Sequence, residues 1–375
     1  MFIGGGHGDS GYRAEEEEML FYRGYGKTLV NHDALAYYRF ARALEDIVLF
    51  AEQILSTDND DNAEDRQQAL HYLQSNFLPE STIAQAYRAL YDSSRLGPSD
   101  DSMQSGKGKA TMVYMSRLLA IMDTDQQGQY YADCANAVLA NYDLGPITVH
   151  FVQHNAGIVY HLDDAQGQPQ FLLKIHESAG DGLVDTPAQL AAQMAWLQAL
   201  TDDGRVIVQA PVANRQGDFV TQVQLPGLDR LSAACCQRWI SAEHVNQWDE
   251  AHAHAVGRLL ATLHTIGAAW PGSTHAEFGS YSDGDLTDAI ERLSIMVELD
   301  VIGGEQYDLV QHAGAQIVAM LAQQLRTDTT FGLIHGDLHQ GNVLFHGLQA
   351  LALDYGAWRF LLSLRSRRLA LSCHL

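Results

Sequence analysis

The sequence predicts an α+β fold with a small β-rich lobe, a larger helical lobe and an additional helical segment at the N-terminus. Between residues 147 and 224, short runs rich in β-branched and aromatic residues are divided by turn residues, as is typical of strands. On both sides of this region, apolar residues recur at the three- and four-residue spacing of amphipathic helices. A chain of 375 residues is long enough for two lobes with a substantial core.

Changes in pattern divide the chain into regions. Residues 1–93 form the N-terminal helical segment, with helices expected over Ala14–Tyr25, Asp33–Leu55 and Arg66–Phe77. Residues 94–110 are polar and rich in glycine and serine, which indicates a linker. The small lobe with a preceding helix then spans residues 111–240, and the helical lobe spans residues 241–375.

Each lobe has its own series of expected elements. The strands expected in the small lobe are Ile147–Val152, Ile158–Leu162, Gln170–Ile175, Val206–Ala210 and Phe219–Gln224. The helices expected there are Met112–Leu139 and Ala188–Leu200, and those of the helical lobe are His244–Leu263, Leu286–Leu299 and Gln306–Leu325.

Charge and composition exclude several classes of function. The formal net charge of −23 argues against a nucleic-acid-binding surface, which is normally basic. An acidic surface suits solubility, and it also suits a cationic substrate. We expect no membrane partner, because no stretch approaches twenty uninterrupted apolar residues, and no signal peptide. Four cysteines without a C-x-x-C pair fit the reducing cytoplasm, and the oligomeric state stays open.

A polar motif near the C-terminus contains the residues best suited to catalysis. In HGDLHQGNVLF, Asp337 and Asn342 stand five residues apart in a loop that we expect to follow a helix, and Asp354 ends an apolar run twelve residues further on. Phosphoryl transfer needs a carboxylate to orient the acceptor hydroxyl, and oxygen ligands to hold magnesium against the phosphates. Asp337 can be the base, and Asn342 and Asp354 can be the metal ligands.

The pattern H-G-D-x-H-x-x-N with a following D-Y-G resembles the aminoglycoside phosphotransferase and choline kinase superfamily. The resemblance implies a protein-kinase-like two-lobe fold, with ATP and Mg²⁺ as cofactors. It also implies that Asp337 is the catalytic base, that Asn342 and Asp354 bind magnesium, and that His335 braces the loop. Under this interpretation His339 lies beside the active site.

A metal-hydrolase interpretation competes for the same segment. His335, Asp337 and His339 alternate in sequence, as zinc ligands on one face of a strand do. That interpretation leaves Asn342 and Asp354 without a role, so it ranks below phosphoryl transfer.

The resemblance also assigns nucleotide-binding residues in the small lobe. Lys174, in QFLLKIH, takes the place of the family's phosphate-binding lysine. The phosphate-covering loop falls in the segment 153–162, which contains a single glycine, Gly157. The helix glutamate that usually pairs with the lysine corresponds to Gln193, which can donate or accept a hydrogen bond but carries no charge. Residues 237–240 resemble the segment between the lobes.

The order of the chain departs from the family's pattern. Only a short basic tail follows Ala357, whereas residues 1–93 resemble the C-terminal helices of spectinomycin-type phosphotransferases. One explanation is a circular permutation in which the linker returns the chain to the small lobe. The other is a fusion of one kinase's tail to a second, truncated kinase with a frameshifted end.

These observations predict an ATP-dependent phosphotransferase acting on a hydroxyl of a small molecule. The first candidate acceptor is an aminoglycoside or aminocyclitol antibiotic. The alternatives are a kinase of homoserine, choline or a related metabolite, and an inactive kinase-like fusion or remnant.

Overall fold

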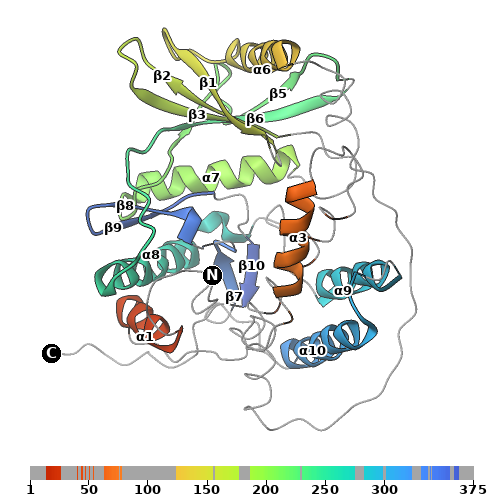
Figure 1. Cartoon of the computed structure of the whole chain (residues 1–375). Helices are drawn as coiled ribbons and strands as arrows, with labels where there is room; N and C mark the ends of the chain where they lie inside the picture. Colours follow the sequence, from red (N-terminus) through yellow and green to blue (C-terminus); the bar gives the residue numbers. More distant parts are fainter. Residues whose placement is uncertain are drawn as a thin grey trace, which may run out of the picture.

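The computed structural model places an antiparallel sheet above a group of helices and short hairpins (Figure 1). The structure describes residues 14–26, 63–75, 77, 124–154, 157–176, 186–228, 230–274, 283–298, 301–322, 331–336, 338, 340–354 and 359–362, and the single positions 40, 44, 47, 50 and 54. The expected helix over residues 33–55 falls mostly outside these residues, as do residues 112–123 of the helix expected before the first strand.

The small lobe contains one antiparallel sheet with the strand order β1-β2-β3-β6-β4, in which β5 also pairs with β6. Its strands are β1 (Thr148–His154), β2 (Gly157–Asp163), β3 (Pro169–His176), β4 (Pro211–Val212), β5 (Val220–Gln224) and β6 (Leu231–Arg238). Strand β1 is at an edge, so its outer side has no neighbouring strand among the described residues.

Most of the expected strands are confirmed, and two differences stand out. The run 206–210 was expected as a strand, but this prediction is wrong, because the short strand β4 begins only at Pro211. Strand β6 was not predicted. After Leu231, its sequence SAACCQR consists of small and polar residues rather than β-branched ones, so its strand conformation comes from pairing with β3, β4 and β5.

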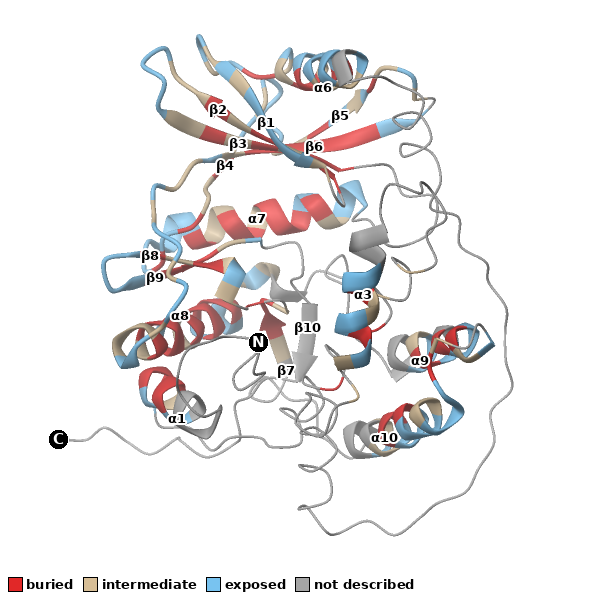
Figure 2. Cartoon of the chain, in the orientation of Figure 1, coloured by how far each residue is buried: buried red, intermediate tan, exposed pale blue. Residues whose placement is uncertain are grey.

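Helices cover the two faces of this sheet. Along β6, Ala233 and Cys235 pack in the core that contains helix α7 (Pro187–Asp203), whereas Ala234 and Cys236 pack in the core that contains helix α6 (Thr124–Leu139). This alternation is the period of a strand buried on both faces. Strand β6 is accordingly buried along most of its length (Figure 2).

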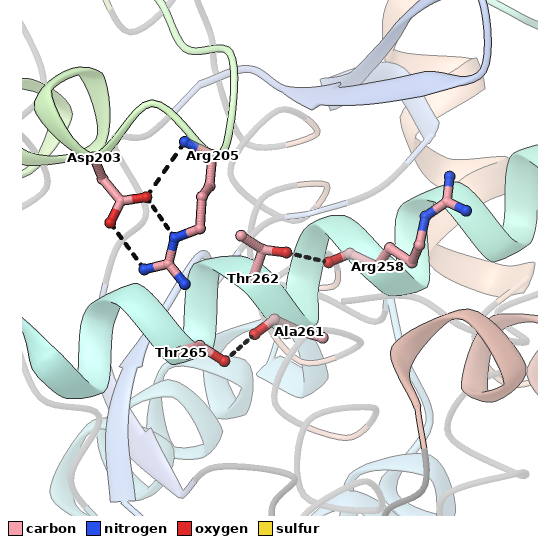
Figure 3. Close-up of polar contacts among 6 residues, drawn as sticks. All are labelled: Asp203, Arg205, Arg258, Ala261, Thr262 and Thr265. Atoms are coloured by element: carbon pink, nitrogen blue, oxygen red, sulfur yellow. Dashed lines mark hydrogen bonds and ion pairs between the residues drawn. The ribbon is translucent and has the colours of Figure 1, made fainter.

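Local signals fix both ends of α7. Thr186 caps the N-terminus through a capping box with Gln189, and Pro187 occupies the first turn. Gly204 ends the helix in the left-handed conformation, with φ +72°. Just beyond it, Arg205 Nε and Nη2 donate to the two carboxylate oxygens of Asp203 at 2.7 and 2.8 Å (Figure 3).

The helical lobe is built around α8 (Glu250–Ala269), which Asp249 caps at its N-terminus. This helix begins later than the expected His244, because the capping carboxylate stands at position 249. Two threonines of α8 donate to carbonyls one turn earlier, Thr262 to Arg258 and Thr265 to Ala261 (Figure 3). The remaining elements are η2 (Pro271–Thr274), α9 (Asp283–Glu298), α10 (Gly304–Ala322), β7 (Phe331–Ile334), η3 (Gln340–Asn342), β8 (Val343–His346), β9 (Gln349–Ala352) and β10 (Arg359–Leu362).

The described parts of the N-terminal segment pack into this lobe. Helix α1 (Ala14–Tyr25) has the predicted bounds and lies against α8, where Phe21 and Tyr25 join the apolar core of that helix. Helix α3 (Ala63–Ser75) covers most of the helix expected over 66–77 and contributes Leu73 to a second core, which it shares with α9 and α10. Among the described residues, no helix is long and apolar enough to cross a membrane.

Candidate active site

Both predicted magnesium ligands, Asn342 and Asp354, lie at the open end of the β8–β9 hairpin. Strand β8 pairs with β9 so that Val343 faces Ala352. One step beyond this pair, the backbone N–H of Leu353 donates to the carbonyl of Asn342 at 2.8 Å. The hairpin therefore places Asn342 beside Asp354, although eleven residues separate them in the sequence.

Asp354 has an unusual backbone conformation. Its φ of +50° is the one positive value at a non-glycine residue in the described part of the chain. The left-handed region is disfavoured for residues with a Cβ, so the surrounding contacts must hold Asp354 there. Its side chain is 52% exposed, which leaves the carboxylate accessible to an ion or ligand.

Lys174 connects the sheet to this hairpin. It lies on β3, and its Nζ is 3.5 Å from Oδ1 of Asp354. The two side chains are 180 residues apart in the sequence, so only the fold brings them together. Lys174, Asn342 and Asp354 thus form one constellation, with an ammonium for phosphate oxygens and two oxygen-bearing side chains of the kind that magnesium prefers.

Hydrogen bonds from the catalytic segment hold the hairpin in place. His335 is buried, and its Nε2 donates to the carbonyl of Leu353 at 2.8 Å, directly before Asp354. Gln340 Nε2 donates to the carbonyls of Val245 and Asn246 at 3.1 and 2.6 Å. The first contact ties the catalytic segment to the backbone directly before Asp354.

The segment follows strand β7, so the prediction of a preceding helix is wrong. The predicted base, Asp337, and His339 lie outside the described residues. Their roles therefore stay predictions from the motif.

Gly157 and Gln193 occupy special positions in the small lobe. Gly157 starts β2 opposite His176, and a Cβ at this position would come within 2.6 Å of the carbonyl oxygen of Ile175. Only glycine fits this close strand approach without a shift of the backbone.

Gln193 is 4% exposed on α7, which makes it one of the few buried polar side chains described. Its pairing with Lys174 stays a prediction.

Sequence reasoning missed His176, two residues after Lys174 on β3. It is buried, and the burial, reinforced by the charge of Lys174, lowers its pKa to about 3, while Asp354 acts in the opposite direction. The imidazole is therefore neutral at ordinary pH beside the Lys174–Asp354 pair. The sequence did contain a signal for this residue. His176 follows Lys174 by two positions, and alternate residues of a strand face the same side.

A small lobe with a β3 lysine, facing an aspartate at the end of a hairpin in a helical lobe, is the arrangement of kinase-like phosphotransferases. The sequence model of the phosphotransferase enzyme family matches residues 152–355, which is more than half of the chain. The chain belongs to this family.

The chain is similar to several solved structures, and the first of those below supports the fold. An amicoumacin kinase in complex with AMP-PNP and Ca²⁺ is 18% identical, with a TM-score of 0.50, over 66% of this chain and 68% of that one. An aminoglycoside phosphotransferase from Alicyclobacillus acidocaldarius is 13% identical, with a TM-score of 0.39, over 60% and 67% of the two chains. A spectinomycin phosphotransferase with ADP and spectinomycin is 12% identical, with a TM-score of 0.32, over 60% and 68%. A comparison with curated proteins gives no match.

Proposed function

We propose that the chain transfers the γ-phosphate of Mg²⁺-bound ATP to a hydroxyl group of a small molecule. The observation that carries the proposal is the 3.5 Å contact between Lys174 and Asp354, at a hairpin end that also holds Asn342. Lysine, asparagine and aspartate at these positions are the nucleotide-binding and magnesium-binding set of kinase-like phosphotransfer.

Each residue of this set has a proposed role. Asn342 and Asp354 hold the magnesium ion, which neutralises charge on the phosphates when it is bound. Lys174 binds the phosphate oxygens, and the strand start at Gly157 brings backbone close to them. Gln193 positions Lys174, and Asp337 accepts the proton of the acceptor hydroxyl.

The direct test is ATP consumption by the purified chain with Mg²⁺ and a panel of aminocyclitols, aminoglycosides and amino alcohols. We expect turnover with at least one acceptor, and its loss in Asp337→Asn while ATP binding persists. Asp308→Asn, an exposed change on α10, is the matched control and should behave as wild type. The absence of both turnover and nucleotide binding would refute the proposal.

For the acceptor we propose an aminoglycoside or aminocyclitol. The support is the resemblance of residues 1–93 to spectinomycin-type enzymes and a net charge of −23, which suits a polycationic sugar. Choline and homoserine belong in the same panel, because their kinases share the catalytic motif. Preference for either would replace the antibiotic proposal and leave the phosphotransferase proposal intact.

The second candidate function is nucleotide binding without turnover, as in an inactive remnant. Its specific support is Gln193, a buried neutral side chain where the family has a glutamate. This candidate predicts that Mg-ATP raises the melting temperature by mass action, while no acceptor on the panel is phosphorylated.

We also propose that the protein works in the cytoplasm, where ATP is available. Cys134, Cys235 and Cys236 are buried, and none of these three forms a disulfide within the described part of the chain. Burial raises the pKa of Cys134 to about 11 and that of Cys236 to about 12, so these thiols stay protonated and unreactive.

A further inference from the structure

Two histidines and an aspartate form a cluster on the β1–β2 hairpin of the sheet. His150 lies on β1, and His161 and Asp163 lie on β2. His150 pairs directly with His161 across the two strands, and their rings are 4.6 Å apart. Asp163 is two residues further along β2, so all three side chains share one face of the sheet.

The potential ligand atoms of the cluster are close together. Nε2 of His150 is 3.1 Å from Oδ2 of Asp163, and Nε2 of His161 is 4.0 Å from Oδ1 of the same carboxylate. Each residue offers one potential ligand atom, and these three atoms all lie within 4.8 Å of one another. Ligand atoms of a tetrahedral zinc ion are about 3.4 Å apart, from bond lengths of about 2.1 Å. Small side-chain rotations would therefore bring all three onto one ion.

Asp163 supplies a second observation that points to a ligand. Its side chain is only 14% exposed, and its Oδ1 is buried with no hydrogen-bond partner among the described residues. A buried carboxylate oxygen without a donor costs free energy, unless a cation or donor satisfies it. The long 4.0 Å approach of His161 does not supply a hydrogen bond.

We propose that His150, His161 and Asp163 bind a divalent first-row transition-metal ion such as Zn²⁺, which clips the edge strand β1 to β2. Two imidazoles and one carboxylate favour Zn²⁺ or Co²⁺ over Mg²⁺ or Ca²⁺, which prefer oxygen ligands alone. Three protein ligands leave a fourth position for water or another ligand.

The position of the cluster suggests what a bound metal ion would do, namely hold the edge strand β1 against β2. Strand β1 is at the edge of the sheet, and β1 and β2 are joined by the two residues between His154 and Gly157. The segment 153–162 is the predicted phosphate-covering loop. A metal bridge at the far end of this hairpin would hold both strands in register. His161 also contacts Trp239, which directly follows β6, with the rings 5.9 Å apart.

The test uses the full-length protein after removal of metal by a chelator, and needs neither ATP nor an acceptor. We expect the wild type to bind one more equivalent of Co²⁺ than His161→Gln does. The Co²⁺-bound wild type should show the visible absorption bands that are typical of a four-coordinate ion. Zn²⁺ should raise the melting temperature of the wild type but not that of His161→Gln or Asp163→Asn. If Asp163→Asn does not fold, His150→Gln replaces it, because the His150 side chain is 45% exposed.

The control is His312→Gln, which changes an exposed histidine on α10 and should bind metal as the wild type does. Equal Co²⁺ stoichiometry in the wild type and His161→Gln would overturn the proposal, and would reduce the cluster to a His150–Asp163 ion pair. Since the readouts are metal binding and melting temperature, the result is independent of the proposed kinase activity.

Discussion

At the scale of single residues, the contact between Lys174 and Asp354 is the central feature. The two charges face each other at 3.5 Å, with side chains that are 32% and 52% exposed. An ion pair with this exposure contributes little to stability. The contact matters instead for the position of the two groups. Under the proposed function, Lys174 already lies where phosphate would bind, and Asp354 lies where magnesium would bind.

Replacement of Lys174 should therefore impair catalysis more than folding. We expect Lys174→Met to lower kcat/KM about 100-fold or more, the magnitude typical of losing one preorganised electrostatic contact, and to change the melting temperature by only a few degrees. Steady-state kinetics and thermal unfolding of the same samples check this. Arg205→Met is the control, since it removes an exposed ion pair beyond α7 (Figure 3). Unchanged kcat/KM would rule out a phosphate-binding role for Lys174.

His176 gives a pH prediction whose sign follows from its lowered pKa. The ordinary value of 6.5 falls to about 3 in the folded chain, so the unfolded chain binds the proton more readily between these values. Its contribution to stability is complete above pH 6.5 and is lost as the pH falls toward 3.

We expect the free energy of unfolding of the wild type to fall more steeply with acid than that of His176→Gln. The difference in slope should approach about 1.4 kcal/mol per pH unit below pH 6. Urea titrations of both proteins from pH 7 to pH 4.5 measure it, and the carboxylates common to both chains cancel in the difference. Parallel curves would show that His176 is not the buried neutral group described here.

At the scale of elements, the sequence predicted those with strong periodicity or clear caps. The strands β1, β2, β3 and β5 and the helices α1 and α7 have local signals of this kind. Strand β6 and the β7 and β8–β9 strands around the catalytic motif were missed, because their short or small-residue runs depend on partners distant in the sequence. The motif indicated candidate site residues, but it did not predict that a hairpin brings Asn342 beside Asp354.

The packing of α1 on α8 depends on two glycines. A Cβ at Gly24 would be 1.9 Å from the carbonyl oxygen of His254, and a Cβ at Gly257 would be 2.2 Å from that of Phe21. Backbones that approach this closely leave no space for a methyl group. Tyr25 Oη then reaches Nδ1 of His264 at 2.7 Å in the buried contact.

Gly257→Ala should therefore separate α1 from α8, despite the better helix propensity of alanine. We expect a lower melting temperature and faster hydrogen exchange in both helices. Gly128→Ala is the matched control, because a Cβ at that helical position has open space around it. It should be neutral or slightly stabilising. A similar response of the two variants would mean that α1 does not pack closely on α8.

At the scale of the whole molecule, the described parts of the N-terminal segment pack into the helical lobe. Buried residues from before and after the small lobe share one core: Phe40, Leu44, Ile47, Leu73, Ile290, Leu293, Met296, Ile302, Val310, Ala313 and Ile334. A segment that resembles the family's C-terminal helices, and that packs on the catalytic lobe, favours the permutation hypothesis. We propose that the described parts of this segment complete the helical lobe.

The core shared by α3, α9 and α10 makes this arrangement testable with one side chain. Leu73 on α3 is fully buried, and its replacement by alanine leaves a cavity, at a cost of about 2–5 kcal/mol. We expect Leu73→Ala to lower the free energy of unfolding by this amount and to speed hydrogen exchange in α9, more than two hundred residues away in the sequence. Leu348→Ala, at a side chain that is 57% exposed, should leave both quantities nearly unchanged. If α9 exchanges at the wild-type rate in Leu73→Ala, the N-terminal segment is an appendage, and the fusion hypothesis replaces permutation.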